Sequence, residues 1–223
     1  YTRRAAAASG GGGGAYDYAL VPVNPNSKDT IRVGRGGAVS NSDGSKGGNG
    51  LDSWFRTQGS GSDVYQMYAN RGSGGNGAKA NSSSTGSYTD YNYSSVQASA
   101  VEGGAISHAG YAGGTGKTGT VLATPSTQRA TGGDGGKAGG NGVSGFAYSS
   151  FAGSSVSGTQ STGTGAKTGT VGDDYGGGGS GASATAEKNN YNGSNQTASG
   201  MGGAGANGIV WIEYIAASAS VSK

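Results

Sequence analysis

A chain of 223 residues with 51 glycines, 3 prolines and no cysteine is poorly supplied for a conventional hydrophobic core, because Leu, Ile, Val and Phe together make up only about a tenth of it. This composition excludes a doubly wound α/β enzyme, a TIM barrel and a helical bundle, each of which needs far more aliphatic side chain. The formal net charge is +3 and 12% of the residues are charged, so the high net charge typical of disordered chains is also missing.

The N-terminal part predicts a β-hairpin over residues 15–34. β-Forming residues cluster in 15–23 and in 28–33, and the Asn-Pro-Asn-Ser sequence between them is typical of a turn. The preceding run of four alanines, residues 5–8, is too short to form a stable helix alone. We therefore expect little or no α-helix.

Glycine spacing predicts the architecture of residues 35–208. Glycine recurs at every third position in several runs, of which the clearest are Gly110, Gly113, Gly116 and Gly119, and then Gly133, Gly136, Gly139, Gly142 and Gly145. A polyproline II helix has three residues per turn, so each run places an edge without side chains along one such helix. These helices contain no internal hydrogen bonds, so they must pack together and bond to one another. We expect a bundle of glycine-rich polyproline II helices; a flexible Gly/Ser linker is the alternative.

The most apolar stretch of the chain closes it. Residues 209–215 read Ile-Val-Trp-Ile-Glu-Tyr-Ile, which is too short to span a membrane and suits a β-strand. We expect this strand to pair with the N-terminal hairpin and to bury Trp211 or its neighbours. The predicted fold is thus a single glycine-rich domain over residues 1–223, mostly irregular, with a few terminal β-strands.

Polar segments with aromatic residues lie between the glycine runs. The candidate binding residues in them are Tyr88, Tyr91, Tyr93, Phe146, Tyr148 and Phe151. Loops rich in Tyr, Ser, Gly and Asn resemble antibody binding loops, in which tyrosine supplies rigid contact area and small polar residues adapt to the partner. Trp54 and Phe55 are expected instead to fold back over the glycine scaffold as part of a small core.

No catalytic, cofactor or metal site is expected. Residues 113–120 look like a phosphate-binding loop, but that motif requires glycine at position 111, where Tyr111 stands. His108 is the only histidine and there is no cysteine, which excludes a His/Cys zinc site. Asp134 and Asp173 fit no calcium-binding motif. The basic residues form no stripe that would favour nucleic acid. We expect a protein that is not an enzyme and that inserts into no membrane.

Several motifs resemble the glycine-rich domain of bacteriophage tail and tail-fibre proteins. They are residues 10–16 (GGGGGAY), 21–26 (VPVNPN), 30–37 (TIRVGRGG), 50–55 (GLDSWF) and 202–214 (GGAGANGIVWIEY). The resemblance covers both ends of the chain, and the middle agrees in its alternation of glycine runs and variable loops. Asn26 departs from the pattern, because family members often have glycine after the turn proline. Distal tail-fibre adhesins are similar in plan, with a polyproline II glycine sandwich whose loops contact a host receptor.

The resemblance implies a virion protein outside the cell that binds a bacterial outer-surface protein or glycan. Other virion or tail-fibre proteins are the further partners that it implies, and self-association is left open. One alternative is a purely structural glycine-rich domain of a virion or an extracellular filament, in which the loops only cap the bundle. Another is an ice-binding protein, although long irregular loops argue against the flat regular face that it needs. The adhesin is favoured if segments 81–101 and 146–162 emerge together at one tip.

Overall fold

A computed structural model describes most of the chain. The described residues are 2–21, 26, 28–40, 42, 44–58, 64–81, 108–111, 113–114, 116–123, 128–139, 159–161, 163–173, 175–188, 194 and 196–214. No helix occurs among them, and so none that is long and apolar enough to cross a membrane. The described residues form thirteen strands in small antiparallel sheets, and the other described residues are irregular. The strands are spread along the whole sequence, whereas they were expected only near its termini.

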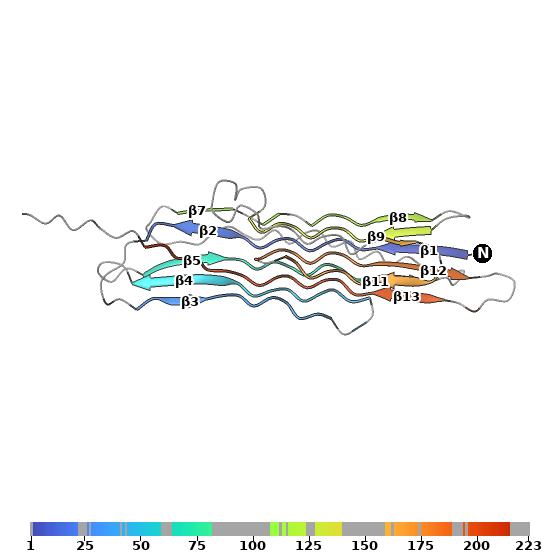
Figure 1. The fold of residues 1–223 in the computed structure, drawn as a ribbon, viewed down its shortest axis with the longest axis horizontal. Coiled ribbons are helices and arrows are strands. Elements are labelled where there is room, and N and C mark those ends of the chain that lie inside the picture. The colour runs from blue at the N-terminus through green and yellow to red at the C-terminus, as the bar shows by residue number, and fades with distance from the viewer. Residues whose placement is uncertain are drawn as a thin grey trace, which may run out of the picture.

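The strands gather at the two ends of an elongated molecule (Figure 1). In chain order they are β1 (Thr2–Ala7), β2 (Tyr16–Ala19), β3 (Thr30–Arg32), β4 (Ser53–Gln58), β5 (Val64–Ala69), β6 (Ala78–Asn81), β7 (His108–Tyr111), β8 (Thr120–Ala123), β9 (Gln128–Thr131), β10 (Thr159–Ser161), β11 (Gly165–Lys167), β12 (Ser183–Lys188) and β13 (Thr197–Gly200). The sheets β3-β4-β5 and β2-β7 form what we call the aromatic end. The sheets β1-β12-β11, β10-β9-β8 and β13-β6 form the alanine end, where the N-terminus lies.

Alanine fills the interfaces between the sheets of the alanine end. Successive residues of a strand point to opposite faces of its sheet. Ala6 of β1 accordingly packs in a buried cluster with Ala80 of β6, whereas Ala5 and Ala7 pack in a second cluster with Ala130 of β9. Both faces of β1 are therefore buried, with exposed fractions of 0–3% for its alanines. The alanine run forms a strand of a three-layer stack, and its small side chains allow the layers to approach closely.

Between the two ends run extended glycine-rich stretches, which we call threads (Figure 1). The threads are residues 8–15, 34–38, 45–51, 70–76, 113–119 without 115, 132–139, 168–173, 176–182 and 201–208. Threads that are far apart in sequence are joined by backbone N–H···O=C hydrogen bonds. These bonds satisfy backbone groups that would otherwise be buried without partners. The middle of the molecule is thus held together by its backbone.

The hydrogen bonds of thread 8–15 repeat every three residues. The amides of Gly11 and Gly14 donate to one neighbouring thread, at 2.8 and 2.7 Å. Those of Gly10 and Gly13 donate to a second thread, both at 2.9 Å. The carbonyls of Gly11 and Gly14 accept from a third. Amides three residues apart thus donate to the same neighbouring thread, and so the thread bonds to several other threads around it.

Glycine is required where the threads touch. A Cβ atom at Gly10 would lie 2.0 Å from the carbonyl oxygen of Asp134, and one at Gly13 would lie 2.0 Å from that of Lys137. Both distances are far inside van der Waals contact, and backbone atoms held by hydrogen bonds on other sides cannot withdraw. Any side chain at these positions would push two threads apart.

The glycine runs singled out in the sequence lie at such contacts. Added Cβ atoms at Gly113, Gly116 and Gly119 would lie 1.8, 2.2 and 2.7 Å from backbone oxygens of thread 8–15. At Gly133 and Gly136 they would lie 1.8 and 2.0 Å from oxygens of thread 113–119.

The other members of these two runs are placed differently. Gly110 belongs to β7, opposite Asp17 of β2. Gly139 lies in a turn with a φ of 61°, a conformation that favours glycine. Gly142 and Gly145 lie outside the described residues.

The predicted hairpin over residues 15–34 is wrong. β2 pairs with β7, with Tyr16 opposite Tyr111, and β3 pairs with β4, with Ile31 opposite Phe55. The local turn sequence favoured a hairpin, but each strand is bonded to a strand from elsewhere in the chain. β3 joins the ladder of β4 and β5, where β-forming residues are concentrated.

The predicted closing strand is also wrong over its described part. Residues 209–214 form no strand, and the last backbone hydrogen bond before them runs from the amide of Gly208 to the carbonyl of Gly34, at 2.7 Å. The expected partners, β2 and β3, are bonded instead to β7 and β4. Trp211, which was expected to be hidden, is 59% exposed, and Tyr214 is 77% exposed.

Candidate functional site

The binding residues predicted from the sequence lie outside the described residues. They are Tyr88, Tyr91, Tyr93, Phe146, Tyr148 and Phe151. The described strands that flank them lie at both ends of the molecule: β6 precedes the first group at the alanine end, and β7 follows it at the aromatic end. The flanking strands therefore do not place both groups of aromatic residues at one shared tip.

At the aromatic end, β4 alternates between buried and accessible side chains. Ser53, Phe55 and Thr57 point into the molecule, with exposed fractions of 7%, 7% and 1%. Trp54 is partly exposed and Arg56 is exposed, since they occupy the opposite face. One face of the β3-β4-β5 sheet is therefore open to solvent.

The strand register brings aromatic and basic residues together on this open face. Arg32 of β3 lies opposite Trp54, and Trp54 lies opposite Tyr68 of β5, so the three form one row across the sheet. Arg56 lies two residues beyond Trp54 on the same face. Directly opposite residues in antiparallel strands have Cβ atoms about 5 Å apart, close enough for their side chains to act together. We call Arg32, Trp54, Arg56 and Tyr68 the arginine–aromatic face.

The carboxylate of Asp52 is held by hydrogen bonds at the edge of this face, which we call its rim. The hydroxyl of Tyr68 donates to Oδ2 of Asp52 at 2.6 Å, and the amide of Arg71 donates to Oδ1 at 3.0 Å. The Arg71 guanidinium lies 3.5 Å from the same carboxylate. The amide of Tyr68 in turn donates to Asp17 of β2 at 3.2 Å. Tyr68 is thus held at both its backbone and its hydroxyl.

These contacts shift the pKa values of the rim. Burial favours the neutral acid of Asp52, but the bonds from Tyr68 and Arg71 and the charges of Arg71 and Arg32 outweigh it, so the pKa of Asp52 lies below its ordinary 3.8. The bond to Asp52, together with burial, raises the pKa of the Tyr68 phenol above 10.0. Burial and the charge of Arg71 lower the pKa of Lys46. The charges of Arg71 and Arg32 thus both act on the carboxylate of Asp52.

Asp52→Asn tests the role of this carboxylate through pH. Because the pKa of Asp52 is lowered by folding, its stabilisation is present above pH 3.8 and is lost as the pH falls through the lowered value. The Asn variant should be less stable by about 1 kcal/mol at pH 7. It should also show a shallower loss of thermal stability between pH 5 and pH 2, roughly the range in which carboxylates titrate. Parallel pH profiles of the melting temperature for the two proteins would contradict this.

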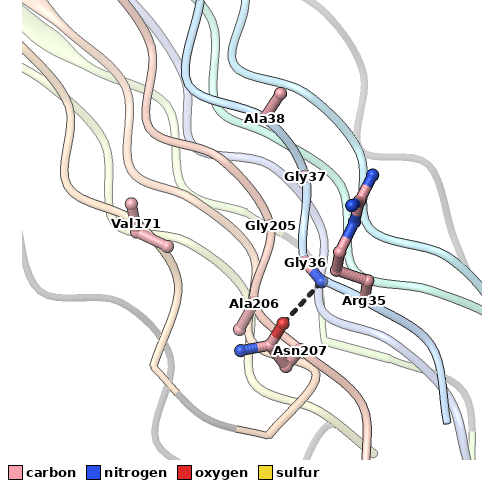
Figure 2. Close-up of a pocket in the computed structure, with 8 residues that line it drawn as sticks. All are labelled: Arg35, Gly36, Gly37, Ala38, Val171, Gly205, Ala206 and Asn207. Carbon is pink, nitrogen blue, oxygen red and sulfur yellow. Dashed lines mark hydrogen bonds between the residues drawn. The ribbon is translucent and has the colours of Figure 1, made fainter.

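A second feature is a shallow groove beside thread 201–208 (Figure 2). It measures about 410 Å³ and is lined by Arg35, Gly36, Gly37, Ala38, Val171, Gly205, Ala206 and Asn207. The side-chain oxygen of Asn207 accepts a hydrogen bond from the amide of Gly36 at 2.7 Å, so it closes a contact between two threads (Figure 2). Arg35 is the one ionisable side chain in the lining, and nothing in it pairs an acid with a base.

The described residues contain no group of three His, Cys, Asp or Glu side chains that could hold a metal ion. On one face of the β3-β4-β5 sheet they carry planar rings and guanidinium groups, with a carboxylate at its edge.

The sequence of the chain matches one known family, described as a glycine-rich domain, over residues 2–215. The chain belongs to this family. The comparison with curated proteins finds no match to this glycine-rich domain, and neither does that with solved structures.

Sequence reasoning missed the arginine–aromatic face of this glycine-rich domain. Phe55 is buried as expected, but Trp54, which was assigned to the core beside it, lies on the solvent side. The alternation in residues 53–57, Ser-Trp-Phe-Arg-Thr, carried the signal, because a strand places Trp54 and Arg56 on one face. The contributions of Arg32 and Tyr68 depend on the strand register.

Proposed function

We propose that this glycine-rich domain is a non-catalytic attachment protein of a bacteriophage virion, of the tail-fibre adhesin kind, which binds a protein or glycan on the bacterial surface. Among the described residues, the buried side chains are mainly alanine, serine and threonine, and glycine threads joined by backbone hydrogen bonds lie between the two ends. We therefore assign recognition of the partner to the two ends of the elongated molecule and to its Tyr-, Ser- and Asn-rich segments.

The threads in this proposal are polyproline II helices. The observation that supports this is that backbone groups three residues apart in a thread bond to the same neighbouring thread. Three residues per turn and no internal hydrogen bonds are the properties of that helix. A bundle bonded in this way is a rigid scaffold, which lowers the entropic cost of presenting binding groups to a partner.

The observation that carries the attachment function is the contrast between an interior of small side chains and a surface that carries aromatic and arginine side chains. At the aromatic end, Arg32 and Arg56 are exposed and Trp54 is partly exposed, on the side of the sheet opposite the buried Phe55. Aromatic and arginine side chains are the residues that dominate binding energy at protein interfaces.

Cell binding by purified protein tests the attachment function. Wild type should bind bacteria of a susceptible strain, and the variant with Tyr88, Tyr91 and Tyr93 replaced by alanine should bind at least about tenfold more weakly. Tyr175→Ala, at an exposed scaffold tyrosine, should bind as wild type does and serves as the control.

Thermal unfolding of the triple variant should match that of wild type, which separates loss of contact from loss of fold. Unchanged cell binding by the triple variant would contradict a role of the three tyrosines in attachment. No binding of wild type to any tested strain would instead favour the second candidate, a purely structural virion or filament domain. The exposed apolar side chains of Trp211 and Tyr214 are the observation that favours that candidate, because such residues suit a contact with another structural protein.

A further inference from the structure

Two aromatic residues lie opposite each other on the arginine–aromatic face. Trp54 and Tyr68 are directly opposite in neighbouring strands, and both are partly accessible. Directly opposite residues have Cβ atoms about 5 Å apart, so the two side chains together offer apolar ring surface on one face of the sheet, which we call the platform. A sugar ring presents a matching flat face of C–H groups with hydroxyls around its edge. The platform therefore suits a saccharide better than it suits a deep-seated apolar ligand.

The charge around the platform selects an acidic partner. Arg32 lies on one side of Trp54 across the sheet, and Arg56 lies further along the same strand; both are exposed. Asp52 is already engaged by Tyr68 and Arg71, and Asp29 accepts a hydrogen bond from Thr57 on the buried face. The guanidinium fork matches carboxylate and phosphate groups, which it binds with two parallel hydrogen bonds.

The platform is also held in place before any ligand arrives. The hydroxyl of Tyr68 is bonded to Asp52, and its amide is bonded to Asp17. A ring fixed at both points loses little conformational freedom on binding. Asp52 is thus a positioning residue, which orients Tyr68 without contacting the ligand.

We infer that the arginine–aromatic face binds an anionic saccharide, with a sugar ring on Trp54 and Tyr68 and its acidic group held by Arg32 and Arg56. This deepens the attachment function proposed above and rests on it, since it assigns the bacterial glycan to a described surface. The acidic group is a carboxylate, as in a uronic acid, or a sugar phosphate.

Tryptophan fluorescence provides a direct test. The chain has two tryptophans, so the Trp211→Phe variant reports from Trp54 alone. This variant is titrated with tetragalacturonate, with glucose 6-phosphate, with uncharged galactotetraose and with inorganic phosphate. We expect a saturable change with at least one of the two charged sugars, and the one that binds identifies the acidic group. Galactotetraose and inorganic phosphate should leave the fluorescence unchanged.

Substitutions in the same background test the assigned residues. Arg32→Ala and Arg56→Ala should each weaken binding about tenfold. Arg129→Ala, at an exposed arginine of β9 at the alanine end, is the matched control and should bind as its parent does. Asp52→Asn should weaken binding by a smaller factor and should leave the dependence on salt unchanged.

Three results would overturn the inference. They are no saturable change with either charged sugar up to about 10 mM, equal binding of galactotetraose or inorganic phosphate, and equal weakening by Arg129→Ala. If wild type binds cells while the sugar titrations fail, the inference falls and the attachment function stands. If the sugars bind but no cells do, the attachment function falls.

Discussion

Gly179→Ala is expected to lower the free energy of unfolding by about 3–5 kcal/mol, because it forces a side chain between two threads. A Cβ at this position would lie 2.1 Å from the carbonyl oxygen of Gly203. The amide of Gly179 donates to Ser73 and its carbonyl accepts from Gly11, so moving the thread breaks bonds on other sides. Urea-induced unfolding, followed by circular dichroism, measures the loss.

Gly36→Ala is the matched control for this effect. At Gly36 an added Cβ would lie 3.0 Å or more from its nearest neighbours, one of which is the movable side chain of Asn207. The same chemical change should therefore cost only about 1 kcal/mol there. Equal losses for the two variants would show that glycine acts through chain entropy, and not by permitting close contact between threads.

The second large effect is expected at the alanine end, where Ala184→Leu should cost about 3 kcal/mol or more. Ala184 is fully buried, lies opposite Ala6 of β1 and packs in the cluster that includes Ala80 of β6. Three additional carbon atoms have no space between the sheets, so the layers must separate.

Ala38→Leu places the same side chain at an exposed position and should change stability by less than about 0.5 kcal/mol. Thermal unfolding of both variants checks this comparison. A melting temperature of Ala184→Leu within a degree or two of wild type would contradict close packing of the alanine layers.

The sequence predicted the contacts of the threads better than it predicted their partners. Glycine at every third position marks where a backbone must approach another within hydrogen-bonding distance, and Gly113, Gly116 and Gly119 lie at such contacts. Nothing in the spacing says which thread lies opposite, because all the threads present the same amides and carbonyls. Gly10 and Lys117, for example, are hydrogen-bonded across more than a hundred residues of sequence.

The strands were harder to predict for a different reason. In residues 5–8 every side chain is alanine and both faces are buried, so no alternation reveals the strand. Around Asn26 the local turn chemistry favoured a hairpin, but β2 pairs with β7, far along the chain, and β3 pairs with β4, the next strand. Trp54 was assigned to the core on its hydrophobicity alone, although the alternation with Phe55 places it outside.

Amide hydrogen exchange, measured residue by residue by NMR, tests most directly whether backbone bonds between glycine threads hold the molecule together. We predict that the amides of Gly11, Gly14, Gly178 and Gly181, which donate across threads, exchange as slowly as the amides of β12, through global unfolding. Exchange of these glycines at the rates of an unstructured peptide, while β12 stays protected, would show that the strands alone hold the fold and would contradict the account.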